Sequence, residues 1–356
     1  MSTIIGRKVR HSIRRKPLII FVLISLLTGA YICFLPPETP VVQREVVVRE
    51  DDVINASLTQ QVRIVEAVCT PALESHSYRA QVNGVILFLA GKNEPFFYKR
   101  ALPLLEVNFL SRYPYPVHVF HEEMAQNYQR RIQKILLSAR NVTFEDISRF
   151  WRTLPHGVSE EQLNEWMNTP EQRRYQKRGY RLMCRFWAGL VWQLPSLDSY
   201  EYYWRLDTDS YLTKPVPCDI FLLMRVEQCV YGYRRIRGEN ARVIKELWPA
   251  FMKWAETALS APEFESMKEF AHNQSKKQYQ GIMYYNNFEL GTIALKRHLL
   301  YTSMFRFLDE NEPYGILRYR WGDAPIHTLG VEAVMLHEGW RKCHFDPKFA
   351  GYSHGK

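Results

Sequence analysis

Residues 200–212 read YEYYWRLDTDSYL, and this stretch decides the fold that the sequence predicts. The apolar and aromatic run at 202–206 predicts a buried strand, and Asp207 and Asp209 follow at its carboxyl end. Charges at the mouth of a buried strand are costly unless a partner compensates them. A metal ion is one candidate partner, a buried arginine such as Arg205 is another, and a turn in which the carboxylates bond local amides is the third.

Strands and helices alternate before this stretch, which is typical of an α/β domain with a parallel sheet. Apolar runs and helical spacings follow one another as strands at 85–91, 115–121 and 142–147 and helices at 94–110, 122–139 and 171–194. Beyond the stretch, helices are predicted near 240–259 and 296–309, with irregular chain at 261–280. Ligands of open α/β sheets bind at the carboxyl ends of the strands, which is where the two aspartates are expected.

The first 35 residues differ from the rest. Six Lys and Arg residues precede an uncharged run, LIIFVLISLLTGAYICFL at 18–35, which is long enough to cross a bilayer. A basic flank favours a cytoplasmic amino terminus. We therefore expect a cytoplasmic tail, a single-pass type II anchor, a lumenal stem and a folded domain, at 1–17, 18–35, 36–80 and 81–356. The alternatives are a cleaved signal peptide for the apolar run and an irregular first part of the domain for 60–80.

Charge and cysteine content agree with a lumenal domain. Much of the net charge of +10 comes from the basic flank, because residues 1–35 contain no Asp or Glu. The other basic residues are spread along the chain, so nothing favours nucleic acid as a partner. Five of the six cysteines lie beyond the apolar run. An oxidising lumen permits two disulfides and one free thiol among them, with the pairing left open. Sequons at Asn55, Asn141 and Asn273 are compatible with this location.

Asp207 and Asp209 are the first candidate site. Carboxylates are hard ligands suited to Mn²⁺ or Mg²⁺, and such an ion neutralises a diphosphate leaving group. His327 lies in RWGDAPIHTLG, residues 320–330. A neutral imidazole completes a metal site begun by an aspartate. The alternative for His327 is a capped, half-buried side chain.

Two further stretches hold candidate residues. Glu289 lies in NNFELG among apolar and amide residues, as a nucleophile, as a carboxylate that stabilises an oxocarbenium ion, or as a structural partner of an arginine. Arg181 and Arg185 share one face of the helix predicted for KRGYRLMCRF, with Tyr180 on the neighbouring face. Two guanidinium groups bind a diphosphate, or each forms an ion pair of its own.

Together and in this order, these stretches resemble the fungal α-1,2-mannosyltransferase family, glycosyltransferase family fifteen. The resemblance covers roughly residues 85–355. It rests on GYRLMCRFWAGL (179–190), YEYYWRLDTDSYL (200–212), CDIF (218–221), YGY (231–233), NNFELG (286–291), RWGDAPIHTLG (320–330) and GYSHG (351–355).

The resemblance implies a GT-A fold, GDP-mannose as the donor substrate, Mn²⁺ as the cofactor and retention of the anomeric configuration. It implies a retaining α-1,2-mannosyltransferase of the Golgi membrane with its catalytic domain in the lumen. The acceptor would be a mannose-terminated glycan on N- or O-linked glycoproteins. Two alternatives stay open from the residues alone: a GT-A transferase with another nucleotide-sugar donor, such as a UDP-sugar, and a non-catalytic lumenal glycan-binding relative.

The same resemblance assigns roles to individual residues. Asp207 takes the place of the metal-binding glutamate in the family's E-P-D, and Asp209 matches the last aspartate of that motif. His327 matches the metal-binding histidine, Glu289 the proposed nucleophile, and Tyr180 an active-site tyrosine near donor and acceptor. The D-T-D of this chain departs from E-P-D by one methylene at the metal ligand, so metal distance and preference are in question.

Overall fold

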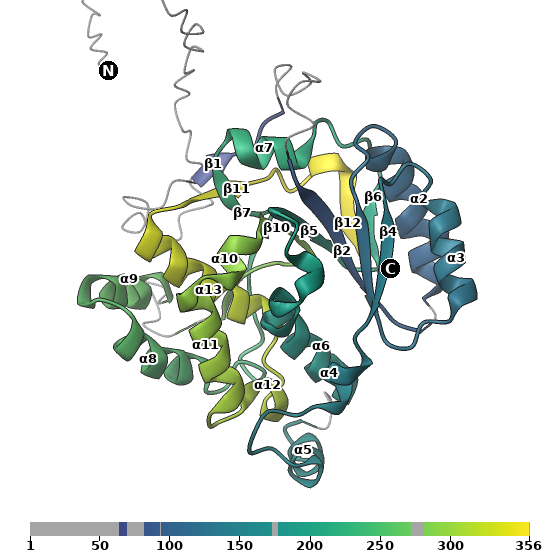
Figure 1. Ribbon diagram of the computed structural model, residues 1–356. Coiled ribbons are helices and arrows are strands. Elements are labelled where there is room, and N and C mark those ends of the chain that lie inside the picture. Colours follow the sequence, from purple (N-terminus) through teal and green to yellow (C-terminus); the bar gives the residue numbers. More distant parts are fainter. Residues whose placement is uncertain are drawn as a thin grey trace, which may run out of the picture. The chain divides into compact units, whose positions relative to one another are not determined.

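The computed structural model describes residues 64–69, 82–92, 94–172, 177–271, 279 and 281–355 (Figure 1). The expected tail, the apolar run at 18–35 and the stem up to residue 63 lie outside these residues. Within the described part of the chain, no helix combines the length and the apolar composition needed to span a bilayer.

A mixed sheet lies at the centre of the described domain, with the spatial order β1–β11–β7–β10–β5–β2–β3–β4 (Figure 1). Its strands are β1 (Ile64–Glu66), β2 (Gly84–Ala90), β3 (Val117–His121), β4 (Val142–Asp146), β5 (Tyr202–Leu206), β7 (Cys229–Tyr233), β10 (Phe288–Thr292) and β11 (Arg341–His344). Strand β10 runs antiparallel to its neighbours β5 and β7, while the other neighbouring strands pair in parallel. The sheet therefore changes direction at β10, beside strand β5, which ends directly before Asp207.

Two short ribbons extend from the sheet. Strand β6 (Ser210–Leu212) pairs antiparallel with β12 (Tyr352–His354), and β8 (Ile236–Gly238) pairs antiparallel with β9 (Ile282–Tyr284). The first ribbon brings two segments that are far apart in the chain to the end of β5.

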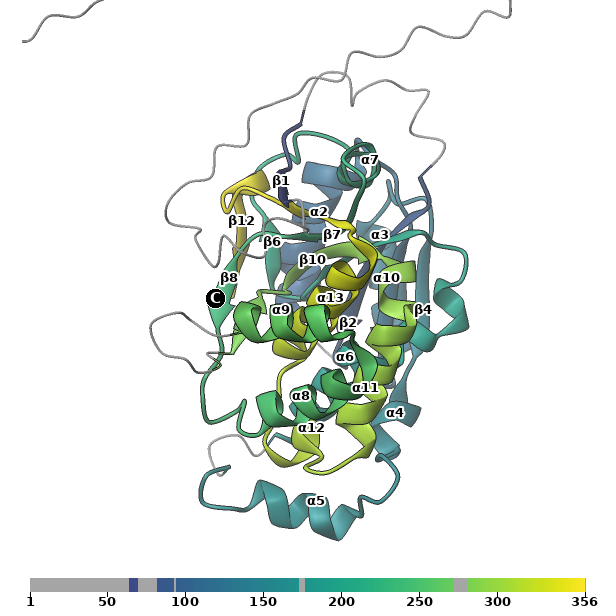
Figure 2. The same ribbon diagram turned by 90° about the vertical axis from the view of Figure 1, so that its left-hand side faces the viewer.

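Each face of the sheet carries its own core, because successive side chains of a strand leave on opposite faces. Val85 and Leu87 of β2 belong to one core, and Ile86 and Phe88 belong to the other. The first face is covered by α4 (Ser148–Arg152), α6 (Arg178–Ala188), α8 (Leu247–Ala258), α9 (Ala261–Ala271), α10 (Ile293–Arg297), α11 (Leu299–Glu310) and α13 (Asp323–Glu338). Figure 2 shows α8, α9 and α11 in front of α13.

The second face is covered by fewer helices. These are α2 (Leu102–Leu105) with π-helical turns on both sides, α3 (Gln126–Ile135) and α7 (Ile220–Val226). A smaller core joins α5 (Glu160–Met167) and α12 (Gly315–Arg318) to the side of α6. Helices on both faces leave the strand ends of the sheet as the place for polar side chains.

The four strands predicted before residue 207 are confirmed, and three other predictions are corrected. The helix expected at 171–194 ends at Gly189, where a Cβ would lie 2.1 Å from the ring of Phe305. Residues 261–271 form α9 rather than irregular chain, since Met267 and Phe270 bury against the first core. Residues 64–66, expected in the stem, form β1 beside β11.

Two disulfides form among the described cysteines. Cys69 pairs with Cys218, and Cys229 pairs with Cys343. Cys184 on α6 is a free, buried thiol. The second bridge joins the neighbouring strands β7 and β11, and the first ties the residues after β1 to the segment before α7. The expectation of two disulfides and one free thiol is thereby confirmed.

Candidate active site

The turn after β5 places two carboxylates side by side. Asp207 follows the last residue of β5, and the amide of Ser210 donates to the carbonyl of Asp207 at 3.0 Å. Ser210 then opens β6, whose partner β12 sets His354 opposite Ser210. Backbone pairing therefore brings His354 to the aspartate turn.

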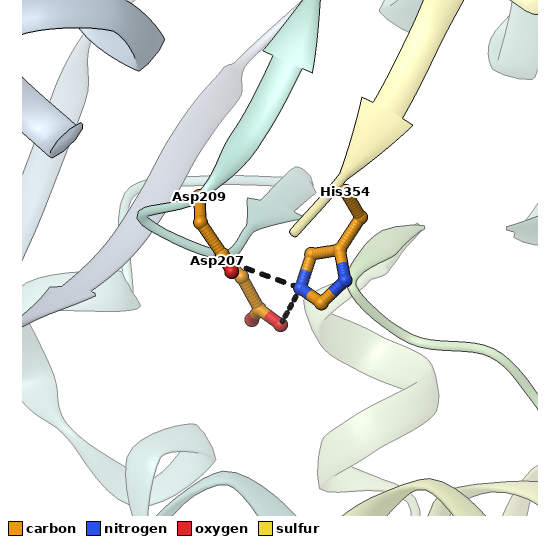
Figure 3. Close-up of side chains that lie close together, drawn as sticks. All are labelled: Asp207, Asp209 and His354. Atoms are coloured by element: carbon orange, nitrogen blue, oxygen red, sulfur yellow. Dashed lines mark ion pairs between the residues drawn. The ribbon is translucent and has the colours of Figure 1, made fainter. Parts of the chain in front are cut away.

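Asp207, Asp209 and His354 form the only group of this kind that the described residues bring together, with one ligand atom from each within 4.8 Å of the others. The Nε2 atom of His354 lies 3.3 Å from Oδ2 of Asp207 and 3.0 Å from Oδ1 of Asp209. Figure 3 shows both carboxylates directed at this nitrogen. Burial alone would lower the pKa of His354, but its hydrogen bonds to the aspartates outweigh burial and raise the pKa to about 9.

This donor set suits a divalent cation. Two carboxylate oxygens and an imidazole nitrogen are ligands that Mn²⁺ accepts. In the described structure the protonated ring of His354 supplies the positive charge between the two carboxylates. A metal ion placed there would meet the same demand for a cation.

Arg205 forms an ion pair with Asp207. This arginine is almost fully buried, at 2% exposure, and its guanidinium carbon lies 4.2 Å from the ring centroid of Trp187. One terminal nitrogen lies 3.4 Å from Oδ1 of Asp207, and the other lies 2.5 Å from Oδ2 of Asp323. Asn286 donates to the same oxygen of Asp323 at 2.8 Å. Arg205 is therefore fixed on one side and supports the aspartate turn on the other.

Glu289 is buried in the core next to the site and does not belong to the group of Asp207, Asp209 and His354. It is fully buried on β10, directly opposite Arg205 of β5. Lys296 contacts its carboxylate at 2.8 Å, and the Tyr203 hydroxyl donates to it at 2.9 Å. Burial alone would raise the pKa of Glu289, but the charges of His327 and Lys296 outweigh burial and hold the pKa well below its usual range. A carboxylate so enclosed has no open path to a sugar, so this geometry argues against the predicted nucleophile.

The structure does not bring His327 to the aspartates. Its Nδ1 lies 3.1 Å from both carboxylate oxygens of Glu289, and its Nε2 lies 2.8 Å from the carbonyl oxygen of Trp187. Both partners lie inside the core, so the two ring nitrogens of His327 are directed at Glu289 and Trp187, and neither is directed at the aspartates. The expected ligand role of His327 is corrected, and His354 occupies the position beside the aspartates.

Six charged residues thus form one connected group, which we call the ionic cluster. Its three cations and three carboxylates balance, as charges removed from water must. The members are Arg205, Lys296, His327, Asp207, Glu289 and Asp323.

Arg181 and Arg185 do not face the site. Arg181 is fully buried and donates to the carbonyl of Leu317 at 2.5 Å. Arg185 forms a bidentate pair with Asp309, at 2.8 to 3.0 Å. The helix face that they share is turned into the core, so the expected diphosphate contact is corrected in favour of structural pairing.

Tyr180 is half-buried on α6 beside the loop before α13. The guanidinium carbon of Arg320 lies 4.0 Å from the centroid of its ring. The neighbouring Cys184, burial and Asp323 together raise the pKa of the Tyr180 hydroxyl. The hydroxyl is therefore neutral, and it shares a hydrogen bond with the buried thiol of Cys184.

A comparison with known families places the chain. A family model described as glycolipid 2-alpha-mannosyltransferase matches residues 43–355. The chain belongs to this family. The family match includes all the residues of the aspartate turn and of the ionic cluster.

Individual family members are 26% and 30% identical to this chain over the stretches that align. The probable mannosyltransferase KTR3 of Saccharomyces cerevisiae is 26% identical over 255 residues, which are 71% of this chain and 62% of the relative. The O-glycoside alpha-1,2-mannosyltransferase homolog 2 of Schizosaccharomyces pombe is 30% identical over 177 residues, 50% of this chain and 46% of the relative. The chain thus spans less than two thirds of the length of these relatives.

Solved structures of similar proteins share the fold. The mannosyltransferase Ktr4p of S. cerevisiae, in complex with GDP, aligns with a TM-score of 0.69 at 21% identity over 83% of this chain and 77% of that chain. Core-mannan synthase A (CmsA/Ktr4) of Aspergillus fumigatus, in its Mn/GDP form, aligns with a TM-score of 0.65 at 22% identity over 82% of this chain and 80% of that chain.

Sequence reasoning missed two members of the site. His354 lies in GYSHG, a stretch that carried the family resemblance without a role of its own. Asp323 lies in RWGDAPIH, four residues before the histidine that was chosen as the ligand. His327 lies on the buried side of α13. His354 lies at the site because β12 pairs with β6, and no local sequence pattern predicts this pairing.

Proposed function

We propose that the chain is a retaining α-1,2-mannosyltransferase that moves mannose from GDP-mannose to a mannose-terminated glycan on glycoproteins. The observation that carries this proposal is the group of Asp207, Asp209 and His354 at the carboxyl end of β5. Family membership supports mannose transfer. The related structures in complex with GDP, or with Mn and GDP, support the donor and the metal.

Asp207, Asp209 and His354 would hold Mn²⁺ in this proposal. When bound, the ion supplies positive charge against the diphosphate of the leaving nucleotide. Arg205 keeps the carboxylate of Asp207 oriented, as outer residues of metal sites do. The neutral hydroxyl of Tyr180 donates a hydrogen bond on the side where donor sugar and acceptor meet. Glu289 acts through Arg205 as a positioning residue. The acceptor hydroxyl would attack the mannosyl carbon from the leaving-group side, so that the new glycosidic bond forms as the bond to the GDP diphosphate breaks and the departing diphosphate takes the hydroxyl proton.

The strand order supports a GT-A fold. The parallel strands β2, β3 and β4 would receive the nucleotide, because nucleotides bind at the carboxyl ends of such strands. The part of the sheet beyond β10 would then face the acceptor. Asp207 stands at the boundary between the two parts.

A type II protein of the Golgi membrane is the location that we infer. The two disulfides support an oxidising compartment. The uncharged run at 18–35 and its basic flank supply the anchor. Protease protection of the domain in sealed microsomes is the expected result, and cleavage without detergent would contradict the orientation.

A donor comparison tests the activity. The purified full-length chain is given GDP-mannose or a UDP-sugar with methyl α-mannoside as the acceptor, first with Mn²⁺ and then with a chelator. Transfer from GDP-mannose that stops with the chelator is the expected result. Transfer only from a UDP-sugar would show that the donor is a UDP-sugar and not GDP-mannose. Binding of mannosides without turnover of any donor would favour a glycan-binding protein.

A further inference from the structure

A pocket of about 470 Å³ lies between α5, α12 and the loop before α8. Both ribbon views place α5 below α12 at the lower end of the domain (Figures 1 and 2). Trp166 and Tyr319 supply aromatic walls, and Arg242, Lys245 and Arg318 supply positive charge. The proposed function has used none of these residues.

The charge of the pocket is unbalanced. Among the described residues that line it, Glu171 is the one acidic side chain, against three cations. Within the described part of the chain, Arg242 and Lys245 have no carboxylate at ion-pair distance, and Arg318 has only Glu312 at 3.5 Å. A hollow with a surplus of two positive charges matches a phosphate monoester, which carries about −1.5 to −2 at pH 7.

Aromatic and amide groups complete the lining. The guanidinium carbon of Arg318 lies 5.8 Å from the ring centroid of Trp166 and 5.3 Å from that of Tyr319, so it lies near both rings. Gln172 is 4% exposed, and its Oε1 accepts a hydrogen bond from Arg181 at 3.0 Å. Its amide nitrogen is left to donate to a ligand. Aromatic rings with polar donors beside them suit a sugar.

A short segment connects the pocket to the aspartate turn. Arg318 and Tyr319 precede Arg320, which covers the ring of Tyr180. Asp323 follows and pairs with Arg205 at 2.5 Å, next to Asp207. The five residue steps from Arg318 to Asp323 span at most about 18 Å even when extended. The pocket therefore lies within reach of an oligosaccharide whose end is at Tyr180.

We propose that this pocket binds a phosphate ester carried by the acceptor glycan, with its sugar ring against Trp166 and Tyr319. The inference rests on the proposed function and narrows its acceptor class to mannose glycans that bear a phosphomonoester. Arg242, Lys245 and Arg318 neutralise the phosphate, and the amide of Gln172 donates to it or to a sugar hydroxyl. No bond is made or broken at this pocket.

Calorimetric binding to the full-length chain tests the proposal. Saturating GDP and Mn²⁺ first fill the donor site, so that a phosphate probe does not bind there. Mannose 6-phosphate, inorganic phosphate and methyl α-mannoside are then titrated separately. We expect mannose 6-phosphate to bind at least about tenfold more tightly than either other probe, because each of those lacks one half of the recognised group. Equal binding of inorganic phosphate would overturn the assignment to a glycan.

Paired variants locate the binding. Arg242→Ala with Lys245→Ala should weaken the binding of mannose 6-phosphate by about tenfold or more, since charge-assisted hydrogen bonds are stronger than neutral ones. Lys253→Ala with Arg306→Ala removes the same charge from exposed positions on α8 and α11, and should leave the affinity unchanged. Equal weakening by both pairs would overturn the pocket in favour of a general charge effect.

GDP binding separates the two proposals. Normal binding of GDP with Mn²⁺, without any binding of mannose 6-phosphate, would overturn this inference and leave the proposed function standing. If the unaltered chain does not bind GDP in the presence of Mn²⁺, the proposed function is overturned, and the inference about the acceptor pocket is overturned with it.

Discussion

The two histidines His354 and His327 differ in what each ring nitrogen faces, and the difference is testable. His354→Ala should lower Mn²⁺ affinity by at least about 10–100-fold, the loss that even outer residues of metal sites cause. Mn²⁺ titration of mannose transfer measures this. His156→Ala, at an exposed position, is the matched control. An unchanged Mn²⁺ requirement in His354→Ala would remove this residue from the ligand set.

Glu289 and Lys296 should behave as a structural pair. Glu289→Gln or Lys296→Met leaves a buried charge without its partner, which costs about 3–5 kcal/mol. The double variant should lose less than the sum of the two single losses, because neither uncompensated charge remains. Denaturant unfolding of all four proteins gives the coupling free energy. Additive losses would show that the 2.8 Å contact carries no energy of its own.

A nucleophilic role for Glu289 predicts a different result. Replacement of a catalytic nucleophile by alanine opens space for azide, which then attacks the sugar in its place. We expect Glu289→Ala to give no mannosyl azide from GDP-mannose at any azide concentration. Formation of mannosyl azide would restore the covalent mechanism and overturn the positioning role.

Sequence patterns identified the two aspartates but not the residues that contact them. Asp207 and Asp209 follow an apolar strand, so local chemistry alone raised the question of a cation. The ion pair of Arg185 with Asp309 and the contact of His354 with the aspartates join residues far apart in the chain. Such pairings depend on how α6 packs against α11 and how β12 pairs with β6. Local sequence patterns do not predict these long-range contacts.

The bridge between Cys229 and Cys343 belongs to the scale of elements, because it fastens β7 to β11 near one edge of the sheet. Cys229→Ser with Cys343→Ser should lower the free energy of unfolding by about 2–5 kcal/mol. Denaturant unfolding with the other bridge intact measures this loss. Cys184→Ser, which removes only a free thiol, is the comparison. Equal stability of the bridged and unbridged chains would contradict the expected role.

Helices and strands could be predicted where the sequence contains an unbroken run of apolar residues. Strands β2 and β5 are almost entirely buried, and parallel strands of this kind read as nearly unbroken apolar runs. The helix at 261–271 was missed because its charged and apolar residues give a weak stripe, and only its docking on the first core makes it helical. Strand β1 was missed because its three residues are stabilised by β11 rather than by their own pattern.

At the scale of the whole molecule, the ionic cluster should make stability depend on pH. Burial would raise the pKa values of Glu289 and Asp323, but the charges of His327, Lys296 and Arg205 hold both below their ordinary values of 4.5 and 3.8. The unfolded chain therefore binds more protons in acid. The stability from these carboxylates is complete above about pH 5 and falls as the pH drops through their folded pKa values.

Between pH 6 and pH 3 the expected loss is on the order of 2 kcal/mol for Glu289 and at most about 1 kcal/mol for Asp323, because the ordinary pKa of an aspartate is lower. Denaturant midpoints measured across this range give the slope. Glu289→Gln should flatten it, because the substituted side chain does not titrate. A slope that is the same in both proteins would mean that other carboxylates govern the acid transition.

The pairing of β12 with β6 also fixes when the cation site is finished during synthesis. β5, β6 and the aspartate turn leave the ribosome well before β12, which is translated after every other described strand. Strand β11, which carries Cys343 of the second bridge, precedes β12 by only a few residues, so the last strand of the sheet, the second bridge and the third member of the site become available almost together. The aspartates therefore lack their third partner until nearly all of the described domain has been synthesised.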